Sequence, residues 1–505
     1  MVKMKSNYYI SSFFWSTASK VFNAILGFVT VPLLLSHFGK AEYGLLSIAT
    51  ACNGYMHLLD LGMNTGAVKF YSQWKAEGQV DKVYRVARTN ITFYLIISAI
   101  NICLLLAVAQ LGESLFSVTH AEFIQLRECL HIIALFCALS WLTTVFNQLL
   151  IADKQIAFTM KVQCLQTLLK AVNVAVIFMA NLTLTSYFFY LTLIVSLAFI
   201  PYAYKCKKDG LIDSLKPSWH WDDFQAVLTF CLSIFALSIF QVTATQSRPI
   251  ILSMFAENGA TSVAEFRIIE VIPQLIIMIA GTFAGIFLPK TSEMVGRKDE
   301  EALHRFVYKW TTYTTVIVGM LTFPFILCAK ETLSAYVGEE YSYLSVWLVV
   351  WIVTVLVQMH TTPGNAVVLA YGRTKLLVWV TAVACVLSMV LNAFLCQYVE
   401  VGSAVIAYFI YVVIIIGLYY LYFYKKLLKL SRWKLFRCFA IPSLIATLLA
   451  AVVSLVPINI SLFGGINERM AYIFVCGIKT LVWMIPYILI LQVTKVVDFK
   501  QLIKK

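Results

Sequence analysis

Residues 402–423 read GSAVIAYFIYVVIIIGLYYLYF and contain no charged side chain. A helix needs about 20 apolar residues to cross a bilayer, so this stretch predicts a membrane span. A basic segment, residues 425–437, follows directly. Because Lys and Arg gather at the cytoplasmic ends of membrane helices, the C-terminal end of this span is predicted to face the cytoplasm.

The same pattern recurs along the whole chain of 505 residues, of which 61% are hydrophobic and 13% charged. An average soluble domain has about 25% charged residues, so the composition excludes a soluble enzyme, a nucleic-acid-binding protein and a secreted disulfide scaffold. Hydropathy predicts fourteen spans. They lie near 11–36, 43–70, 86–111, 124–151, 158–180, 186–204, 227–255, 264–288, 307–329, 341–370, 376–397, 402–423, 437–456 and 470–493.

The distribution of Lys and Arg orients these spans. With the N-terminus placed in the cytoplasm, 30 of the 39 basic residues fall on inner connections and five on outer ones. The outer five are Lys40, Arg127, Arg267, Lys330 and Arg469. This alternation predicts that both termini are cytoplasmic, and it makes most of the net charge of +14 a topology signal rather than evidence of a polyanion partner.

An internal repeat relates the two halves of the chain. Four local matches recur at separations of 217 to 219 residues. They pair 32–38 with 249–255, 113–115 with 331–333, 147–152 with 365–370, and Asn173 with Asn392. The separation pairs span 1 with 7, span 4 with 10 and span 5 with 11, so the repeat unit is six helices. Six is even, so both units enter the membrane in the same orientation, related by a pseudo-two-fold axis along the membrane normal.

The predicted fold class is therefore an all-α polytopic membrane protein of fourteen helices, with two six-helix bundles and two extra C-terminal helices. Four segments follow from this prediction. They are an N-terminal bundle (1–205), a cytoplasmic linker (206–226), a C-terminal bundle (227–424), and a basic loop with helices 13 and 14 and a basic tail (425–505). Such an architecture favours an alternating-access transporter.

Three motifs carry a resemblance to a known family. The first is Leu35-Ser-His-Phe-Gly39-x-x-x-Tyr43-Gly44 between spans 1 and 2, and the second is Leu58-Leu-Asp60-Leu-Gly62 in span 2. The third is Asn365-Ala-Val-Val-Leu-Ala-Tyr-Gly372-Arg373 after span 10. Together with the 6 + 6 + 2 organisation they resemble the multidrug/oligosaccharidyl-lipid/polysaccharide (MOP) exporter superfamily, in its O-antigen and capsule flippase branch.

The resemblance implies a function. The substrate would be a polyprenyl-diphosphate-linked oligosaccharide, moved from the inner to the outer leaflet of a bacterial inner membrane for lipopolysaccharide O-antigen, capsule or exopolysaccharide assembly. Implied partners are the bilayer, a coupling H⁺ or Na⁺, and the polysaccharide polymerase and assembly machinery. Two departures argue against a cationic drug as substrate. Span 7 reads Gln246-Ser-Arg-Pro249 where many relatives carry an acidic residue, and span 1 carries Lys20 instead of an acid.

Charged residues inside spans are the candidate site residues, because each costs at least about 2.5–3.5 kcal/mol to insert. Four are basic: Lys20, Lys170, Arg248 and Lys479. Two are acidic: Asp60 and Glu270. This excess of positive charge predicts a cationic cavity that binds the diphosphate, with Asn, Gln and aromatic side chains for the sugars.

Each candidate also has a structural interpretation. Lys20 and Lys170 could pair with Asp60, Arg248 could bind carbonyls freed by Pro249, and Lys479 lies outside the repeat. His57 and Asp60 share a helix face, so they could couple an ion or simply hold the helix in place. Arg267 and Glu270 are three residues apart, which predicts a local ion pair or an outer gate.

Two other functions were weighed. A proton- or sodium-coupled drug or metabolite antiporter would need the opposite sign of intramembrane charge. A membrane glycan polymerase would need a large outer loop with catalytic residues, whereas the longest outer connections, near 112–123 and 457–469, are short and carry no catalytic motif. The twelve cysteines occur singly, without a C-x-x-C pair. We therefore expect no enzyme activity, no cofactor and no metal site.

Overall fold

The computed structural model describes residues 2–372, 375–458 and 467–497. These residues form helices joined by short loops, and no strand occurs among them. The all-α prediction is confirmed for this part of the chain. Arg373 of the third motif and the basic tail 498–505 lie outside the described residues.

The chain divides into two compact units, Met1–Ala264 and Glu265–Lys505, which we name the N-terminal and C-terminal units. The four segments predicted from the sequence, with a linker at 206–226, stay a prediction. The helix that follows this linker packs on the first three helices of the N-terminal unit and belongs there by its contacts.

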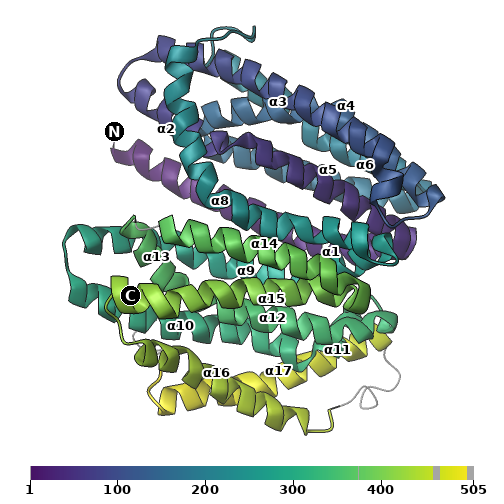
Figure 1. The fold of residues 1–505 in the computed structure, drawn as a ribbon, viewed down its shortest axis with the longest axis vertical. Helices are drawn as coiled ribbons and strands as arrows, with labels where there is room; N and C mark the ends of the chain where they lie inside the picture. The colour runs from purple at the N-terminus through teal and green to yellow at the C-terminus, as the bar shows by residue number, and fades with distance from the viewer. Residues whose placement is uncertain (1, 373–374, 459–466, 498–505) are drawn as a thin grey trace. The chain divides into compact units, whose positions relative to one another are not determined.

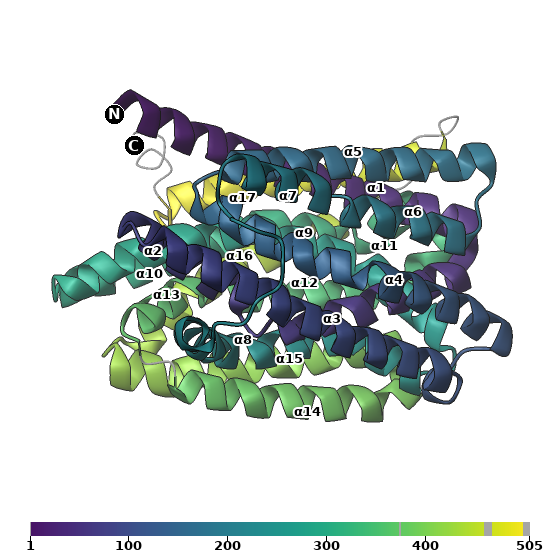
Figure 2. The same cartoon turned by 90° about the horizontal axis from the view of Figure 1, so that it is seen from above.

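Helices of the N-terminal unit include some that run longer than a single span (Figures 1 and 2). They are α1 (Val2–Met56), the 3₁₀ turn η1 (His57–Asp60), α2 (Met63–Ala76), α3 (Val80–Leu115), α4 (His120–Ala152), α5 (Ile156–Ala180), α6 (Leu184–Ser196), α7 (Phe199–Lys208) and α8 (Trp221–Phe255). α1 contains predicted span 1 and the first part of predicted span 2, and it kinks at Gly39 with φ 76° and ψ 179°. Only glycine adopts that conformation without strain, which explains its place in the first motif. In this unit α4 packs between α3 and α6, and α1 packs along α5.

Helices of the C-terminal unit begin with α9, which crosses the unit boundary. They are α9 (Gly259–Gly296), α10 (Glu300–Leu327), α11 (Ala329–Tyr336), the 3₁₀ turn η2 (Glu339–Leu344), α12 (Ser345–Met359), α13 (Thr362–Ala370), α14 (Lys375–Val399), α15 (Val401–Leu418), the π-helical turn η3 (Tyr419–Leu427), α16 (Arg432–Ser454) and α17 (Glu468–Val493). α14 and α15 lie side by side in both views (Figures 1 and 2), whereas α16 and α17 pack on α10 and α11.

Eleven helical segments among the described residues are long and apolar enough to cross a membrane. One of them, Ala18–Asp60, includes parts of two predicted spans, because it runs through the kink at Gly39. α8 and α9, which correspond by position to predicted spans 7 and 8, are not among the eleven. The protein is a multi-pass membrane protein, and the count of fourteen spans stays a prediction.

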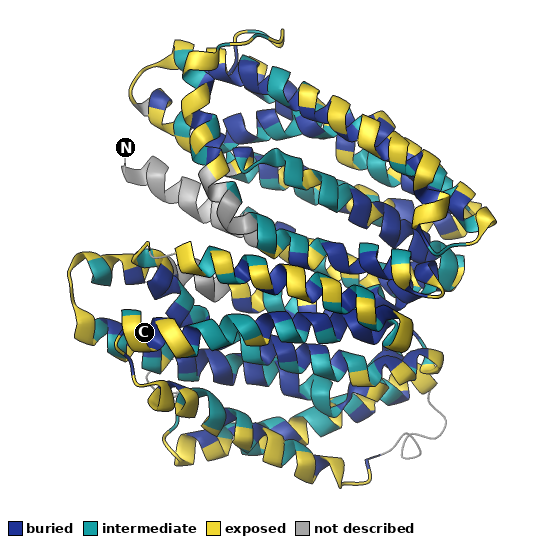
Figure 3. Ribbon diagram, in the orientation of Figure 1, coloured by how far each residue is buried: buried dark blue, intermediate teal, exposed yellow. Residues whose placement is uncertain are grey.

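Exposed surface of these helices is strongly apolar. Figure 3 shows exposed positions along α14, and they include Trp379, Val383 and Phe394. Apolar exposure on this scale is unusual for a soluble protein and typical of a surface in contact with a membrane.

Candidate substrate cavity

The second predicted span is broken in the N-terminal unit. α1 ends at Met56, η1 forms one tight turn, and Leu61 and Gly62 both adopt left-handed conformations before α2 begins. A break of this kind inside a span leaves backbone groups without helical partners, so it is tolerated only where protein or a water-filled cavity surrounds it.

Asp60 holds this break together. Its carboxylate accepts a hydrogen bond from the backbone N–H of Asn64, 3.1 Å away in the first turn of α2, and another from the Tyr94 hydroxyl at 2.5 Å. A carboxylate at a helix N-terminus satisfies free N–H groups and interacts favourably with the helix dipole. No ion pair joins Asp60 to Lys20 or Lys170 among the described residues. The local geometry therefore matches the structural interpretation of Asp60, and an ion-coupling role stays a prediction.

A buried hydrogen-bond chain continues from Asp60 into the bundle. Gln148 donates to the Tyr94 hydroxyl at 2.9 Å, and Asn90 donates both to Gln148 at 2.9 Å and to the Tyr71 hydroxyl at 3.2 Å. All four side chains are at most 1% exposed. Such a chain ties α2, α3 and α4 together, because each partner would be costly to leave unpaired in an apolar interior.

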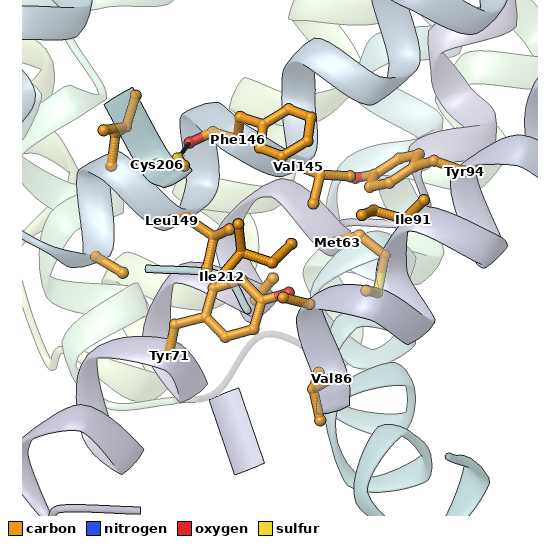
Figure 4. Close-up of a cluster of buried hydrophobic side chains, with 14 of the residues drawn as sticks. Met63, Tyr71, Val86, Ile91, Tyr94, Val145, Phe146, Leu149, Cys206 and Ile212 are labelled. Carbon is orange, nitrogen blue, oxygen red and sulfur yellow. Dashed lines mark hydrogen bonds between the residues drawn. The ribbon is translucent and has the colours of Figure 1, made fainter. Parts of the chain in front are cut away.

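An apolar core surrounds this chain. Figure 4 shows Tyr71 and Tyr94 among apolar side chains that include Met63, Ile91 and Leu149. The core fixes the rotation of α2, α3 and α4 about their axes, and with it the direction in which their remaining polar side chains point.

A cavity of about 220 Å³ lies in the same unit, beside the break. We call it the N-terminal cavity. Side chains from α1, η1, α3, α4, α5 and α6 line it, so six elements of the N-terminal unit converge there. Its polar lining consists of Thr50, Asn53, His57, Asn101, Ser140, Lys170 and Thr192.

Among the residues that the structure describes, Lys170 is the one ammonium group on this lining. Its side chain is half-buried in α5, and within the described part of the chain it forms neither a hydrogen bond nor an ion pair. A membrane-embedded cation without a counter-ion is costly, which marks it as a candidate for binding an anion. Lys170 and His57 both line this cavity. Asp60 lies in the same 3₁₀ turn as His57, η1.

Asn101 of α3 is the second unusual group on the lining. The residue is 1% exposed, and neither its amide nitrogen nor its oxygen has a hydrogen-bond partner among the described residues. Burying an amide without partners costs about 1–3 kcal/mol. Asn101 is a residue of the cavity lining, but each of its two amide atoms has less than 1 Å² of exposed surface, so they are buried against protein rather than open to the cavity.

Trp141 of α4 links the cavity to the buried hydrogen-bond chain. It is 3% exposed, stacks on Tyr94 with ring centroids 5.3 Å apart, and contacts the His57 ring at 5.0 Å. Trp141 thus forms part of the cavity wall and also packs against Tyr94, whose hydroxyl donates a hydrogen bond to Asp60. We therefore expect a substitution that changes the shape of the cavity to shift the residues of the break, and a substitution in the break to change the shape of the cavity.

The remaining basic candidates lie elsewhere. Lys20 is exposed on α1 and is not part of the cavity lining. Arg248 is 3% exposed in α8 and donates from Nε to the Ala244 backbone oxygen at 3.0 Å. This backbone contact is of the kind that its structural interpretation predicts, although α8 continues through Pro249. The substrate-binding roles of Lys20 and Arg248 stay predictions.

Candidate charges of the C-terminal unit are engaged in ion pairs. Arg267 and Glu270 pair at 2.5 Å within α9, so the ion pair predicted from their spacing is present, and its role as an outer gate stays a prediction. Lys479 of α17 pairs with Glu331 of α11 at 2.6 Å. This contact gives Lys479 a structural partner that the sequence does not indicate.

Sequence reasoning missed Asn53, Asn101 and Trp141. One signal was available for Asn101, because a carboxamide in the middle of the apolar span 86–111 needs a reason to be there. No comparable signal exists for Trp141, since aromatic residues are abundant in this chain.

A family model described as Polysaccharide biosynthesis protein matches residues 10–295, more than half of the chain. The chain belongs to this family. Among curated proteins, none matches the sequence. The match includes the whole N-terminal unit except its first residues, and therefore the N-terminal cavity.

Solved structures resemble this chain over most of its length. "Lipid II flippase MurJ, inward closed conformation" covers 96% of this chain and 100% of its own, with a TM-score of 0.70 and 14% identity. "Inward-facing conformation of a multidrug resistance MATE family transporter of the MOP superfamily" covers 78% of this chain and 92% of its own, with a TM-score of 0.66 and 16% identity. A structure of the MATE multidrug transporter DinF-BH covers 83% of this chain and 95% of its own, with a TM-score of 0.59 and 14% identity. The predicted superfamily is confirmed, and this protein has the fold of its transporters.

Proposed function

We propose that this protein moves a polyprenyl-diphosphate-linked oligosaccharide from the inner to the outer leaflet of the bacterial inner membrane by alternating access, for surface polysaccharide assembly. Both termini lie in the cytoplasm. The carrying observation is Lys170, an ammonium group on the N-terminal cavity that has no counter-ion among the described residues, in a member of the polysaccharide biosynthesis family.

Charge decides between the two substrate classes that the fold accommodates. An anionic substrate that enters the bundle loses hydration, and a cation on the cavity wall offsets part of this cost. A cationic drug would meet Lys170 as a like charge, and the nearby carboxylate of Asp60 already accepts two hydrogen bonds. This distribution favours the lipid-linked oligosaccharide over the drug or metabolite antiporter.

His57 and Asp60 are the residues that we assign to ion coupling. They lie in the break of the second span, next to the cavity, where a protonation or cation-binding event can be coupled to occupation of the cavity. The polymerase and assembly machinery are partners at the outer face, where the flipped substrate is delivered.

The test is leaflet exchange of a fluorescent polyprenyl-diphosphate oligosaccharide with a neutral glycan, in liposomes that contain the purified protein. Wild-type protein is expected to flip it, and Lys170→Met is expected to lose at least about tenfold in rate, because about 1.4 kcal/mol of charge stabilisation corresponds to that factor. Lys161→Met is the matched control, because Lys161 lies on the same helix but does not line the cavity.

Two outcomes would contradict the proposal. One is the absence of exchange by wild-type protein alongside proton- or sodium-driven efflux of a cationic dye, which would identify a drug antiporter. The other is equal exchange rates for Lys170→Met and Lys161→Met, which would remove the cavity from the transport path.

A further inference from the structure

We propose that Cys328 and Cys476 form a disulfide that ties α17 to the junction between α10 and α11. This goes beyond the proposed function and does not depend on the substrate. It depends on the predicted orientation, which places both cysteines toward the outer face of the membrane. Lys330, next to Cys328, and Arg469, at the start of α17, are two of the basic residues predicted on outer connections.

The two cysteines are far apart in the sequence and meet in the fold. Cys328 is the residue at which α10 ends and α11 begins, and Cys476 lies in the first half of α17. Their side chains are hydrogen-bonded to each other. In the part of the chain that the structure describes, no other two of the twelve cysteines form such a contact. This pair is therefore the one that the fold places for a disulfide.

Polar contacts beside the thiols hold the two helices in register. Lys479 pairs with Glu331 at 2.6 Å, and each of these residues lies three positions after one of the cysteines. Residues three apart share a helix face, so the same faces of α11 and α17 meet at both pairs. Thr332 adds a further contact, because its hydroxyl lies 3.9 Å from the Cys476 sulfur and its N–H donates to the Cys328 backbone oxygen at 2.7 Å. The cysteines are thus positioned before any covalent bond forms.

Exposure differs between the two thiols and sets the order in which they react. Cys328 is 1% exposed, whereas Cys476 is partly exposed. The accessible Cys476 thiol reacts first with an oxidant, and the buried Cys328 thiol then closes the bond from inside. Because one of its sulfurs is buried, the finished disulfide is shielded from reductants, as structural disulfides are.

The oxidant is the disulfide of a thiol–disulfide oxidoreductase in the outer compartment, because structural disulfides form in oxidising compartments. The Cys476 thiolate attacks one sulfur of that disulfide, forms a mixed disulfide and releases one thiol of the oxidoreductase. The Cys328 thiolate then attacks the Cys476 sulfur and releases the second. The two protons lost by this chain end on the oxidoreductase, and two electrons reduce its disulfide to a dithiol.

The disulfide joins the extra C-terminal helices to the rest of the C-terminal unit. α16 and α17 pack on α10 and α11 (Figure 1). A covalent bond between α17 and the α10–α11 junction makes this helix pair move with the unit as one body. Cys328 and Cys476 also close a long loop, and a cross-link of this kind constrains the unfolded chain strongly, so the bond stabilises the fold.

The experiment alkylates free thiols in intact cells with N-ethylmaleimide, purifies the full-length protein without reductant, and identifies disulfide-linked peptides by mass spectrometry. Most molecules are expected to carry the Cys328–Cys476 link, which dithiothreitol removes. Cys438 of α16 is the internal control, because it is partly exposed like Cys476 but lies near the predicted cytoplasmic end of its helix. It is expected to be alkylated and unlinked.

Thermal unfolding distinguishes a disulfide from a contact between free thiols. Reduction, verified by mass spectrometry, is expected to lower the melting temperature of the wild-type protein by at least about 5 °C. The double variant Cys328→Ser/Cys476→Ser is expected to melt at the same temperature with and without dithiothreitol. Cys438→Ser is the matched control and is expected to respond to the reductant as wild type does.

Three results would overturn the proposal. The first is alkylation of both Cys328 and Cys476 in protein trapped in cells, and the second is a link from either one to a different cysteine. The third is an unchanged melting temperature of the wild-type protein after verified reduction, which would show that the bond does not tie the helices. The flipping assay tests the proposed function separately, so either one can fail while the other holds.

Discussion

Lys20 and Lys170 show that the packing around a residue, and not its position along a span, decides whether it lines a cavity. Both are lysines near the middle of predicted spans, and the sequence predicts the same cationic-cavity role for both. In the structure Lys170 lines the N-terminal cavity, whereas Lys20 is exposed on α1 away from it. Which way a helical side chain points depends on the rotation of the helix against its neighbours, and that rotation is a property of packing.

Tyr94 is the residue on which the buried hydrogen-bond chain depends, because its hydroxyl donates to Asp60 and accepts from Gln148. Tyr94→Phe leaves the buried Gln148 amide nitrogen without its acceptor and leaves Asp60 with only the hydrogen bond from Asn64, so the free energy of unfolding is expected to fall by about 1–3 kcal/mol. Denaturant titration of the purified protein measures it. Tyr84→Phe is the control, since its hydroxyl bonds the exposed Gly210 carbonyl at 2.8 Å, where water can replace it. Equal losses in the two variants would show that the chain is not cooperative.

At the scale of elements, the break between α1 and α2 is the most informative feature. The motif Leu58-Leu-Asp60-Leu-Gly62 lies across it, with Asp60 capping α2 and Gly62 turning the backbone. The loose motif that the sequence analysis used for family resemblance therefore corresponds to a specific device: a span interrupted beside a cavity. Discontinuous helices next to substrate sites are common in secondary transporters.

Gly62 tests this device. Its φ of 76° disfavours any other residue, and a Cβ there would lie 2.8 Å from the Cys231 backbone oxygen. Gly62→Ala is expected to cost about 1–3 kcal/mol of stability and to impair transport. Gly27→Ala is the matched control, because a Cβ on Gly27 meets no atom within 4 Å and alanine favours the helix. Thermal unfolding measures the melting temperatures of both variants. A Gly62→Ala protein as stable as wild type would contradict the interpretation that the turn needs a glycine here.

The pairing of α17 with α11 can be separated from substrate binding by a double substitution. Lys479 and Glu331 pair with side chains 12% and 21% exposed, so Lys479→Met is expected to cost about 1–3 kcal/mol by leaving Glu331 without its partner. Adding Glu331→Gln is expected to restore stability and transport together. A double variant that is stable but does not transport would show that Lys479 contacts the substrate.

At the scale of the whole molecule, the orientation in the membrane follows from basic residues alone. Inner connections carry most of the Lys and Arg, and the prediction places the C-terminal end of α7 inside and the loop between α3 and α4 outside. The family and the fold agree with a multi-pass transporter, and neither of them tests this orientation.

Labelling of introduced cysteines tests the orientation. Ser114→Cys lies in the predicted outer loop region and Lys207→Cys on the inner side, and both positions are exposed. A membrane-impermeant maleimide is expected to modify Ser114→Cys in intact cells, and Lys207→Cys only after permeabilisation. Wild-type protein, with its own twelve cysteines, sets the background. The reverse pattern would invert the whole topology.

The sequence by itself determined the class of protein, the approximate spans and the superfamily. These depend on local properties: the length of apolar runs, the placement of Lys and Arg, and a few Gly and Asp landmarks such as Gly39, Asp60 and Gly62. The Arg267–Glu270 ion pair was also predictable, because its partners are three residues apart on one helix.

Only the tertiary structure decided which polar groups share a cavity. Lys170, Asn101 and Asn53 are on three helices, and no sequence pattern states that these helices turn the same faces toward one another. Lys479 found Glu331 across 148 residues for the same reason. Cavities and long-range ion pairs arise from the packing of whole helices, and a span's hydropathy is nearly the same whichever way the helix is rotated.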